Sequence, residues 1–198
     1  MELSIFLSLV AYACATTFSP GPNNVLLLSC GAQYGFKKCL KLLLGIWTGL
    51  VTVMLICSFG CSLIGNLIPQ IEPFARVIGA AYILWLGYKT LTKKVSNDNS
   101  SNTDVPLTYV NGFLLQFLNV KILMLGVAAY CSFILPTDSS FLPTFVFALT
   151  MAACAACGNL IWITVGTLIL PIYKKHYRIF NVIMALLLFY CVYKIIFL

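Results

Sequence analysis

Six long apolar segments, separated by shorter polar stretches, dominate the sequence of this 198-residue chain. A helix needs roughly 20 predominantly apolar residues to cross a bilayer core about 30 Å thick, and each segment is about that long or longer. The pattern therefore predicts an all-α membrane protein with six transmembrane helices, forming one transmembrane domain over residues 1–198. The segments are about Leu3–Tyr34, Leu42–Ile68, Phe74–Leu91, Leu107–Leu135, Phe141–Leu170 and Phe180–Leu198.

A polar linker at residues 96–105, rich in Ser, Asn and Asp, divides the chain near its middle. Its composition is typical of a loop, and it separates halves of about residues 1–95 and 106–198. Each half holds three of the predicted helices, so the second half enters the membrane in the opposite direction to the first. The segment count therefore predicts two inverted three-helix repeats, a geometry found in many secondary transporters.

Composition agrees with lipid as the main solvent. The chain is 61% hydrophobic and 9% charged, whereas a soluble domain is about a quarter charged. This excludes an ordinary soluble enzyme. Nearly all of the nine cysteines lie inside apolar segments, which favours packing residues over a disulfide framework. The N-terminus has no signal-peptide pattern, so the first apolar segment is expected to remain in the mature protein.

Basic residues predict the orientation of the helices. The chain has 12 Lys and Arg against 5 Asp and Glu, and most of the bases lie in connections that follow odd-numbered segments. Cytoplasmic loops carry an excess of Lys and Arg, so these connections are predicted to be cytoplasmic and both termini to lie on the outer side. The bases in these connections are Lys37, Lys38, Lys41, Lys89, Lys93, Lys94, Lys174, Lys175 and Arg178.

The first segment is too long for one straight crossing. As a single helix from Ser4 to Tyr34 it would be about 46 Å long. Pro20 and Pro22 interrupt it, and a proline inside a helix leaves the carbonyl four residues earlier without its donor. The carbonyls of Thr16 and Phe18 are therefore predicted to be freed at membrane depth, where irregular backbone is tolerated only inside protein or beside a cavity.

A second half-helix is predicted to begin after this break. Gly21 allows the chain to turn, and Pro22 suits the first position of a helix. The amides near Asn23 and Asn24 would then form a helix N-terminus, which attracts anions. The alternative is a proline kink that serves packing, but two prolines and two asparagines within five residues favour a binding site.

A second candidate site lies in the fourth segment. Lys121 is the only ionisable side chain well inside an apolar segment, and such a residue costs roughly 2.5–3.5 kcal/mol to insert. It is expected to face a cavity, with Gln116 and Asn119 on the same broad helix face; the alternative is that its side chain snorkels to an interface. A third candidate is Asn159 in the fifth segment, for which helix packing is the favoured explanation.

Other motifs are weaker. Gly45 and Gly49 form a GxxxG pattern, which predicts close helix packing. Cys154 and Cys157 form a CxxC pattern on a small-residue helix face, and with other membrane cysteines they leave a thiol-redox carrier as a rival interpretation. His176 is expected to be a solvated loop residue. No catalytic group, metal site, cofactor or nucleotide-binding loop is predicted, so any transport would be driven by a gradient.

Several motifs along the chain carry a resemblance to a known family. They are Phe18–Asn23, Gly31, Gly35–Phe36, Gly45, Gly49, Gly79–Gly87, Gln116–Ile122, Phe133–Pro136, Gly158–Asn159 and Ala185–Leu188. Through these residues the sequence resembles the LysE/RhtB family of amino-acid exporters, closest to its cysteine/O-acetylserine branch. Most members of that family carry Asn-Pro-Lys in the fourth helix, whereas this chain has Asn119-Val120-Lys121, so the resemblance leaves open whether that helix is broken.

The resemblance implies that the chain is a transporter and not an enzyme. It implies export of a small neutral amino acid, cysteine or O-acetylserine, across the bacterial cytoplasmic (inner) membrane by alternating access, driven by the proton gradient or the membrane potential. The substrate carboxylate would meet the amides near Asn23 and Asn24 or Lys121, and its ammonium would meet Asn119 and the freed carbonyls. The predicted partners are this substrate and the lipid bilayer, with no nucleic acid and with homo-oligomerisation left open.

Three other interpretations remain at this point. The chain could export another amino acid, such as homoserine, threonine or lysine. It could act as a transmembrane thiol-redox carrier, or as a membrane scaffold that transports nothing.

Overall fold

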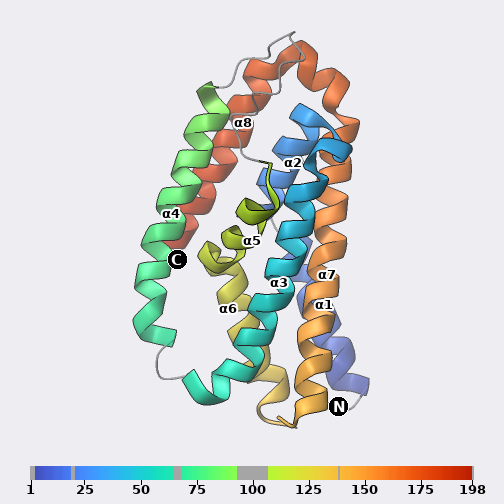
Figure 1. Ribbon diagram of the computed structural model, residues 1–198, viewed down its shortest axis with the longest axis vertical. Helices are drawn as coiled ribbons and strands as arrows, with labels where there is room; N and C mark the ends of the chain where they lie inside the picture. The colour runs from blue at the N-terminus through green and yellow to red at the C-terminus, as the bar shows by residue number, and fades with distance from the viewer. Residues whose placement is uncertain (1–2, 19–20, 65–67, 93–106, 138, 198) are drawn as a thin grey trace.

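The computed structural model describes residues 3–18, 21–64, 68–92, 107–137 and 139–197, and within these ranges all regular structure is helical (Figure 1). This confirms the predicted all-α class. The helices are α1 (Leu3–Phe18), α2 (Pro22–Tyr34), α3 (Phe36–Ile64), α4 (Ile68–Thr92), α5 (Tyr109–Leu118), α6 (Val120–Ala129), a π-helical turn η1 (Tyr130–Ile134), α7 (Phe141–Leu168) and α8 (Leu170–Phe197).

Three helices are long and apolar enough to cross a membrane: α3, α7 and α8. Two further spans result if the bent pairs, α1 with α2 and α5 with α6 and η1, each count as one crossing. The described part of the chain therefore contains between three and five candidate spans by length and composition. The six spans and their inverted-repeat arrangement stay a prediction.

The first apolar segment forms two helices in the described residues. α1 ends at Phe18 and α2 begins at Pro22, and their axes differ by 53°. Pro22 lies in the first turn of α2 as predicted, and Gly21 precedes it in an extended conformation. The Val25 amide donates the first helical hydrogen bond to the Gly21 carbonyl at 2.9 Å. The predicted contribution of Pro20 falls outside the described residues.

The fourth apolar segment is also broken, although it has no proline at the break. α5 ends at Leu118, α6 begins at Val120, and the two are bent by 59°. Asn119 lies between them with φ −87° and ψ 90°, which is an extended and not a helical conformation. Its carbonyl accepts the first bonds of α6, from the amides of Ile122 and Leu123. Asparagine is a favoured residue at this position before a helix.

One segment boundary predicted from polarity is wrong, and a second is right only at its central residue. α3 begins at Phe36, so its bases Lys37, Lys38 and Lys41 are helical. The stretch around His176, predicted to be a loop, is helical on both sides within α8, but His176 itself is non-helical, with φ −127° and ψ 34°, and the helix is kinked there. Lysine and arginine are good helix formers, so a run of them marks an exposed helix turn as readily as a loop. His176 is exposed, as predicted.

The basic turns gather at one end of the bundle. The junction between α2 and α3, the C-terminal end of α4 and the beginning of α8 all lie at this end (Figure 1). The N-terminus lies at the opposite end, and the C-terminal end of α8 lies about halfway along the bundle. The bases in these described turns are Lys37, Lys38, Lys41, Lys89, Lys174, Lys175 and Arg178.

The apolar core is divided into two clusters. The first apolar cluster joins α2, the beginning of α3, α4, the end of α7 and α8, with Leu115 of α5 and Val120 of α6. The second joins α1, the middle of α3, α6, η1 and the first half of α7. On α3 the division falls between Ile46 and Leu50, and on α7 between Ala155 and Ile163. A layer of buried polar residues, which we call the polar layer, lies where the two clusters divide. Its members are Thr17, Asn23, Asn24, Gln116, Asn119 and Asn159.

Glycines allow two of the helices to approach closely. Gly45 and Gly49 of α3 face the backbone of α5, where a Cβ atom would collide with the carbonyls of Tyr109 and Phe113. This confirms the packing predicted from the GxxxG pattern. Because α5 leads directly to Asn119, the close contact determines where the second break lies relative to the first.

Candidate functional site

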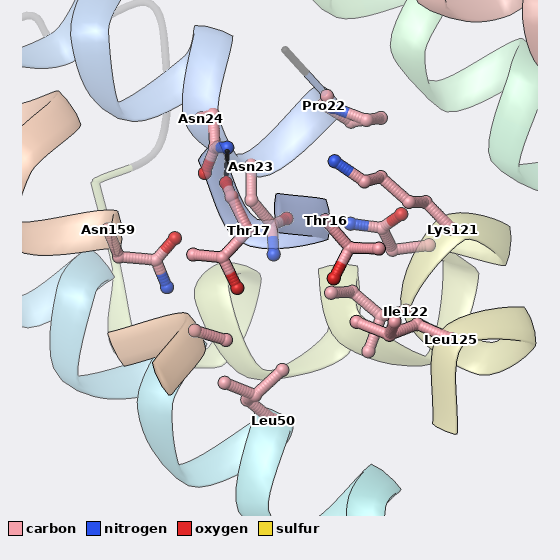
Figure 2. A pocket seen from close by; sticks show the side chains of 13 residues that line it. Thr16, Thr17, Pro22, Asn23, Asn24, Leu50, Lys121, Ile122, Leu125 and Asn159 are labelled. Carbon is pink, nitrogen blue, oxygen red and sulfur yellow. Dashed lines mark hydrogen bonds between the residues drawn. The ribbon is translucent and has the colours of Figure 1, made fainter. Parts of the chain in front are cut away.

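A small cavity lies between the ends of α1 and α2 and the junction of α5 with α6, and we call it the polar cavity because amide and ammonium side chains reach its wall. It is bordered by the ends of α1 and α2 together with α3, α6 and α7, and its volume is about 30 Å³ (Figure 2). The buried apolar residues of its wall belong to the second apolar cluster. The lining residues are Thr16, Thr17, Gly21, Pro22, Asn23, Asn24, Leu50, Asn119, Lys121, Ile122, Leu125, Ala155 and Asn159.

The end of α1 is joined to the beginning of α2 by a buried hydrogen bond. The Asn24 side-chain amide donates to the Thr17 carbonyl at 2.7 Å. The Thr16 hydroxyl instead donates back to the Tyr12 carbonyl at 2.8 Å within α1. Thr16 lines the cavity as predicted, whereas Phe18 is 49% exposed and does not line it. The α1 carbonyl that accepts this bond from α2 is therefore that of Thr17.

Asn23 and Gln116 form a reciprocal pair between the two breaks. The Asn23 amide donates to Gln116 Oε1 at 2.7 Å, and Gln116 Nε2 lies 3.4 Å from Asn23 Oδ1. Gln116 also donates to the Gly112 carbonyl at 3.1 Å and is fully buried. Gln116 does not line the cavity, so the structure gives it the position of a support for Asn23.

Asn119 presents an acceptor that has no partner. Its side chain is 1% exposed, and its Oδ1 accepts no hydrogen bond from any group in the described part of the chain. A buried polar atom left unsatisfied costs about 1–3 kcal/mol, and most buried polar atoms in native structures are paired. An orphaned oxygen in the wall of a cavity is therefore suited to bind a donor from a ligand or a water molecule.

Lys121 reaches from the second break to the first. Its side chain lies against Gly21, where an added Cβ would be 2.9 Å from Lys121 Cδ and 3.0 Å from Nζ. Figure 2 shows the ammonium group beside Pro22, at the N-terminal end of α2. Because Gly21 has no Cβ atom, the Lys121 side chain can occupy the space beside it. The side chain lines the cavity.

Asn159 enters the cavity from α7. It is 3% exposed, and Figure 2 shows it on the opposite side of the cavity from Lys121. The neighbouring Gly158 leaves room for the Thr17 side chain, with which a Cβ at that position would collide. Gly158 therefore allows α7 to pack against the end of α1, and Asn159 lines the cavity.

Sequence reasoning did not single out the apolar wall of the cavity, which consists of Leu50, Ile122, Leu125 and Ala155. These residues resemble every other apolar residue of a membrane helix, so only the packing of α3, α6 and α7 could identify them. Thr17 was also missed. Its position directly after Thr16 at the end of α1 was the available signal.

The described cysteines are distributed over the bundle, and Cys131 and Cys157 are exposed. Cys154 and Cys157 line neither the polar cavity nor a metal site; no group of three His, Cys, Asp or Glu side chains is assembled within the described ranges.

Comparison with known proteins gives the family. The family model described as "LysE type translocator" matches residues 14–196. The chain is 34% identical over 184 residues to a cysteine/O-acetylserine efflux protein of Salmonella typhimurium (strain LT2), with 93% of each chain covered. It is 34% identical over 187 residues to a cysteine/O-acetylserine efflux protein of Escherichia coli O6:H1 (strain CFT073), again with 93% of each covered. No solved structure matches. The chain therefore belongs to the LysE-type translocator family.

Proposed function

We propose that this chain exports a small neutral amino acid, cysteine or O-acetylserine, across the bacterial inner membrane. The family and the printed names of relatives that are 34% identical over 93% of the chain support this assignment. Homoserine, threonine and lysine are the competing substrates.

The observation that carries the proposal is the pairing of opposite binding groups in one cavity. Lys121 and the N-terminus of α2 supply positive charge, and the buried Oδ1 of Asn119 supplies an unsatisfied acceptor. An amino-acid zwitterion needs both, because a charge that is buried without a partner is expensive. The two breaks bring these groups together, although Gly21 and Lys121 are far apart in the sequence.

Each group then has a role in the proposed site. In a conformation that widens this cavity, the substrate carboxylate binds Lys121 and the amide end of α2, where Asn23 and Asn24 follow Pro22. The ammonium donates to Asn119 Oδ1, with Asn159 across the cavity as a further polar contact. The side chain of the substrate lies against Leu50, Ile122 and Leu125, an apolar wall that suits a short thiol or acetyl group. The Asn24–Thr17 and Asn23–Gln116 bonds hold the breaks in place.

The two apolar clusters supply the proposed gates. Alternating access requires the cavity to open to one side while packing closes the other. The first cluster closes the end that carries the basic turns, and the second closes the opposite end. We place the basic end in the cytoplasm, with six spans as two inverted repeats. Transport is driven by the proton gradient or by the membrane potential, which supplies about 2.3 kcal/mol per charge per 100 mV; Lys121 is the candidate proton carrier.

Export from purified protein in liposomes tests the proposal. Vesicles are preloaded with labelled cysteine, O-acetylserine, threonine or lysine, and efflux is measured with and without a pH gradient. We expect cysteine and O-acetylserine to leave faster than threonine and lysine, and an imposed gradient to accelerate them. Efflux no faster than from protein-free liposomes refutes the proposed function, and a preference for lysine or threonine refutes the substrate assignment.

A further inference from the structure

A second, larger cavity opens beside the polar one. It is a cleft of about 460 Å³ between α4, α6 and α8, and it shares Gly21, Pro22 and Lys121 with the polar cavity. The Lys121 side chain, lying against Gly21, therefore stands at the boundary between the two. The sequence pattern did not indicate this cleft, because the three helices that form its walls are far apart in the sequence, with α4 in the first half of the chain and α6 and α8 in the second.

The cleft is lined by three cations from three different helices. These are Arg76 of α4, Lys121 of α6 and Lys194 of α8. The Arg76 guanidinium donates to the Ile195 carbonyl at 3.0 Å, which holds it across the space between α4 and α8. The Lys194 ammonium lies 5.8 Å from the centre of the Tyr190 ring, which also lines the cleft. Three positive charges around one apolar-walled cleft attract anions.

The side chains of all five Asp and Glu residues lie outside the described part of the chain, among them Glu72, which precedes Arg76 by one helical turn on α4. The test below therefore measures the charge preference of the cleft directly.

Size separates the roles of the two cavities. A volume of about 30 Å³ holds one or two water molecules and is too small for an amino acid. The cleft, at about 460 Å³, has room for one. In this conformation a substrate can therefore bind in the cleft but not in the polar cavity, and Lys121 is the group that both spaces have in common.

We propose that the cleft is an access site in which Arg76 and Lys194 bind the carboxylate of the transported molecule before it passes to Lys121. The inference rests on the proposed function and extends it, because it assigns specificity to two residues outside the polar cavity. Arg76 and Lys194 select molecules with a carboxylate, and Lys121 transfers the bound molecule between the two cavities.

Cys191 provides a test that does not depend on transport, since it lines the cleft and is free. Detergent-solubilised protein is treated with anionic sulfonatoethyl or cationic trimethylammonioethyl methanethiosulfonate, and labelling is resolved by peptide mass spectrometry. Exposed Cys157 of α7 is the internal reference. The thiolate fraction of Cys191 affects both reagents equally, so the anionic-to-cationic rate ratio reports the local charge. We expect this ratio to be at least fivefold higher at Cys191 than at Cys157, and to fall to the Cys157 value in Arg76→Gln/Lys194→Gln protein.

O-Acetylserine should also protect Cys191 from the anionic reagent, whereas its amide, which lacks the carboxylate, should not. Equal ratios at Cys191 and Cys157 overturn the inference. Failure of both reagents to label Cys191 overturns it too, because the cleft would then not admit a molecule of this size. A thermal unfolding temperature in detergent equal to that of the native chain establishes that the fold of the double variant is intact.

Transport kinetics separate this inference from the proposed function. In liposomes, Lys194→Gln is expected to raise the KM for cysteine about fivefold with kcat within twofold, and Arg76→Lys to retain most of the affinity that Arg76→Gln loses. Lys38→Gln, the same charge change on an exposed turn of α3, is the matched control. Unchanged KM values with active export refute the access site and leave the proposed function standing. No export by the native chain refutes the proposed function, while the labelling ratio still decides whether the cleft binds anions.

Discussion

Replacing Lys121 with methionine separates a transport role from a structural one. Methionine keeps the length and most of the volume of lysine, so the packing against Gly21 is retained while the ammonium is removed. The side chain is half-buried and lines both cavities. The substitution therefore changes the charge at the centre of the proposed site and little else.

The structure indicates the size of the effect. A hydrogen bond to a charged group contributes about 1.5–3 kcal/mol, and each 1.4 kcal/mol is a factor of about ten in affinity. Loss of the contact to the substrate carboxylate should therefore lower kcat/KM for cysteine about 10- to 100-fold. The free energy of unfolding should rise or stay the same when the lysine is removed, because a lysine at membrane depth costs roughly 2.5–3.5 kcal/mol to insert.

Two measurements on the same preparation check this. Efflux of labelled cysteine from liposomes gives kcat/KM, and thermal unfolding in detergent gives Tm. Lys38→Met on the exposed first turn of α3 is the control, and both of its values should match those of the native chain. If Lys121→Met exports cysteine at the native rate, Lys121 has no part in binding. If its Tm falls together with transport, the lysine is a packing residue and the scaffold interpretation gains support.

Three further substitutions follow from the geometry. Gly21→Ala would place a Cβ 2.9 Å from Lys121 Cδ, so we expect the lysine to be displaced and the KM for cysteine to rise several-fold with little change in Tm; an unaltered KM would contradict the proposed contact. Gly49→Leu would drive a side chain into the backbone of α5, and this overpacking should lower stability by about 1–3 kcal/mol, measured by unfolding against an exposed Leu44→Ala control; native stability would refute the close approach. Replacing all cysteines with serine or alanine should leave most cysteine efflux intact, whereas complete loss of activity with a retained fold would favour the thiol-redox carrier.

Much of the candidate site could be predicted because its signals are local. Two prolines and two asparagines within five residues marked the first break, and a lysine in an apolar segment marked the second. Six of the predicted residues line the cavity from these two places: Gly21, Pro22, Asn23, Asn24, Asn119 and Lys121. Each is unusual in an apolar membrane segment, because an interrupted backbone or a charge there requires a protein or water partner.

The differences between prediction and structure have an equally physical origin. The turn around Lys37 and the neighbours of His176 were predicted to be non-helical because polarity was taken as a loop signal, although lysine and arginine favour helices. The break at Asn119 was left open because no proline marks it. Gln116 was predicted beside the substrate, and in the structure its amide group bonds Asn23 and Gly112. Hydrogen-bond assignments of this kind depend on neighbours that a one-dimensional pattern does not contain.

The sequence by itself determined the solvent and the helical class, and it predicted the interruption at Pro20 and Pro22, because composition, hydrophobic runs and prolines act over a few residues along the chain. Only the tertiary structure decided which polar groups meet. Asn23 pairs with a glutamine 93 positions away, Lys121 occupies the space that Gly21 leaves, and Arg76 and Lys194 face one cleft from α4 and α8. These contacts depend on how closely helices approach and how each is rotated, and those are set by packing between elements that the linear pattern leaves unspecified.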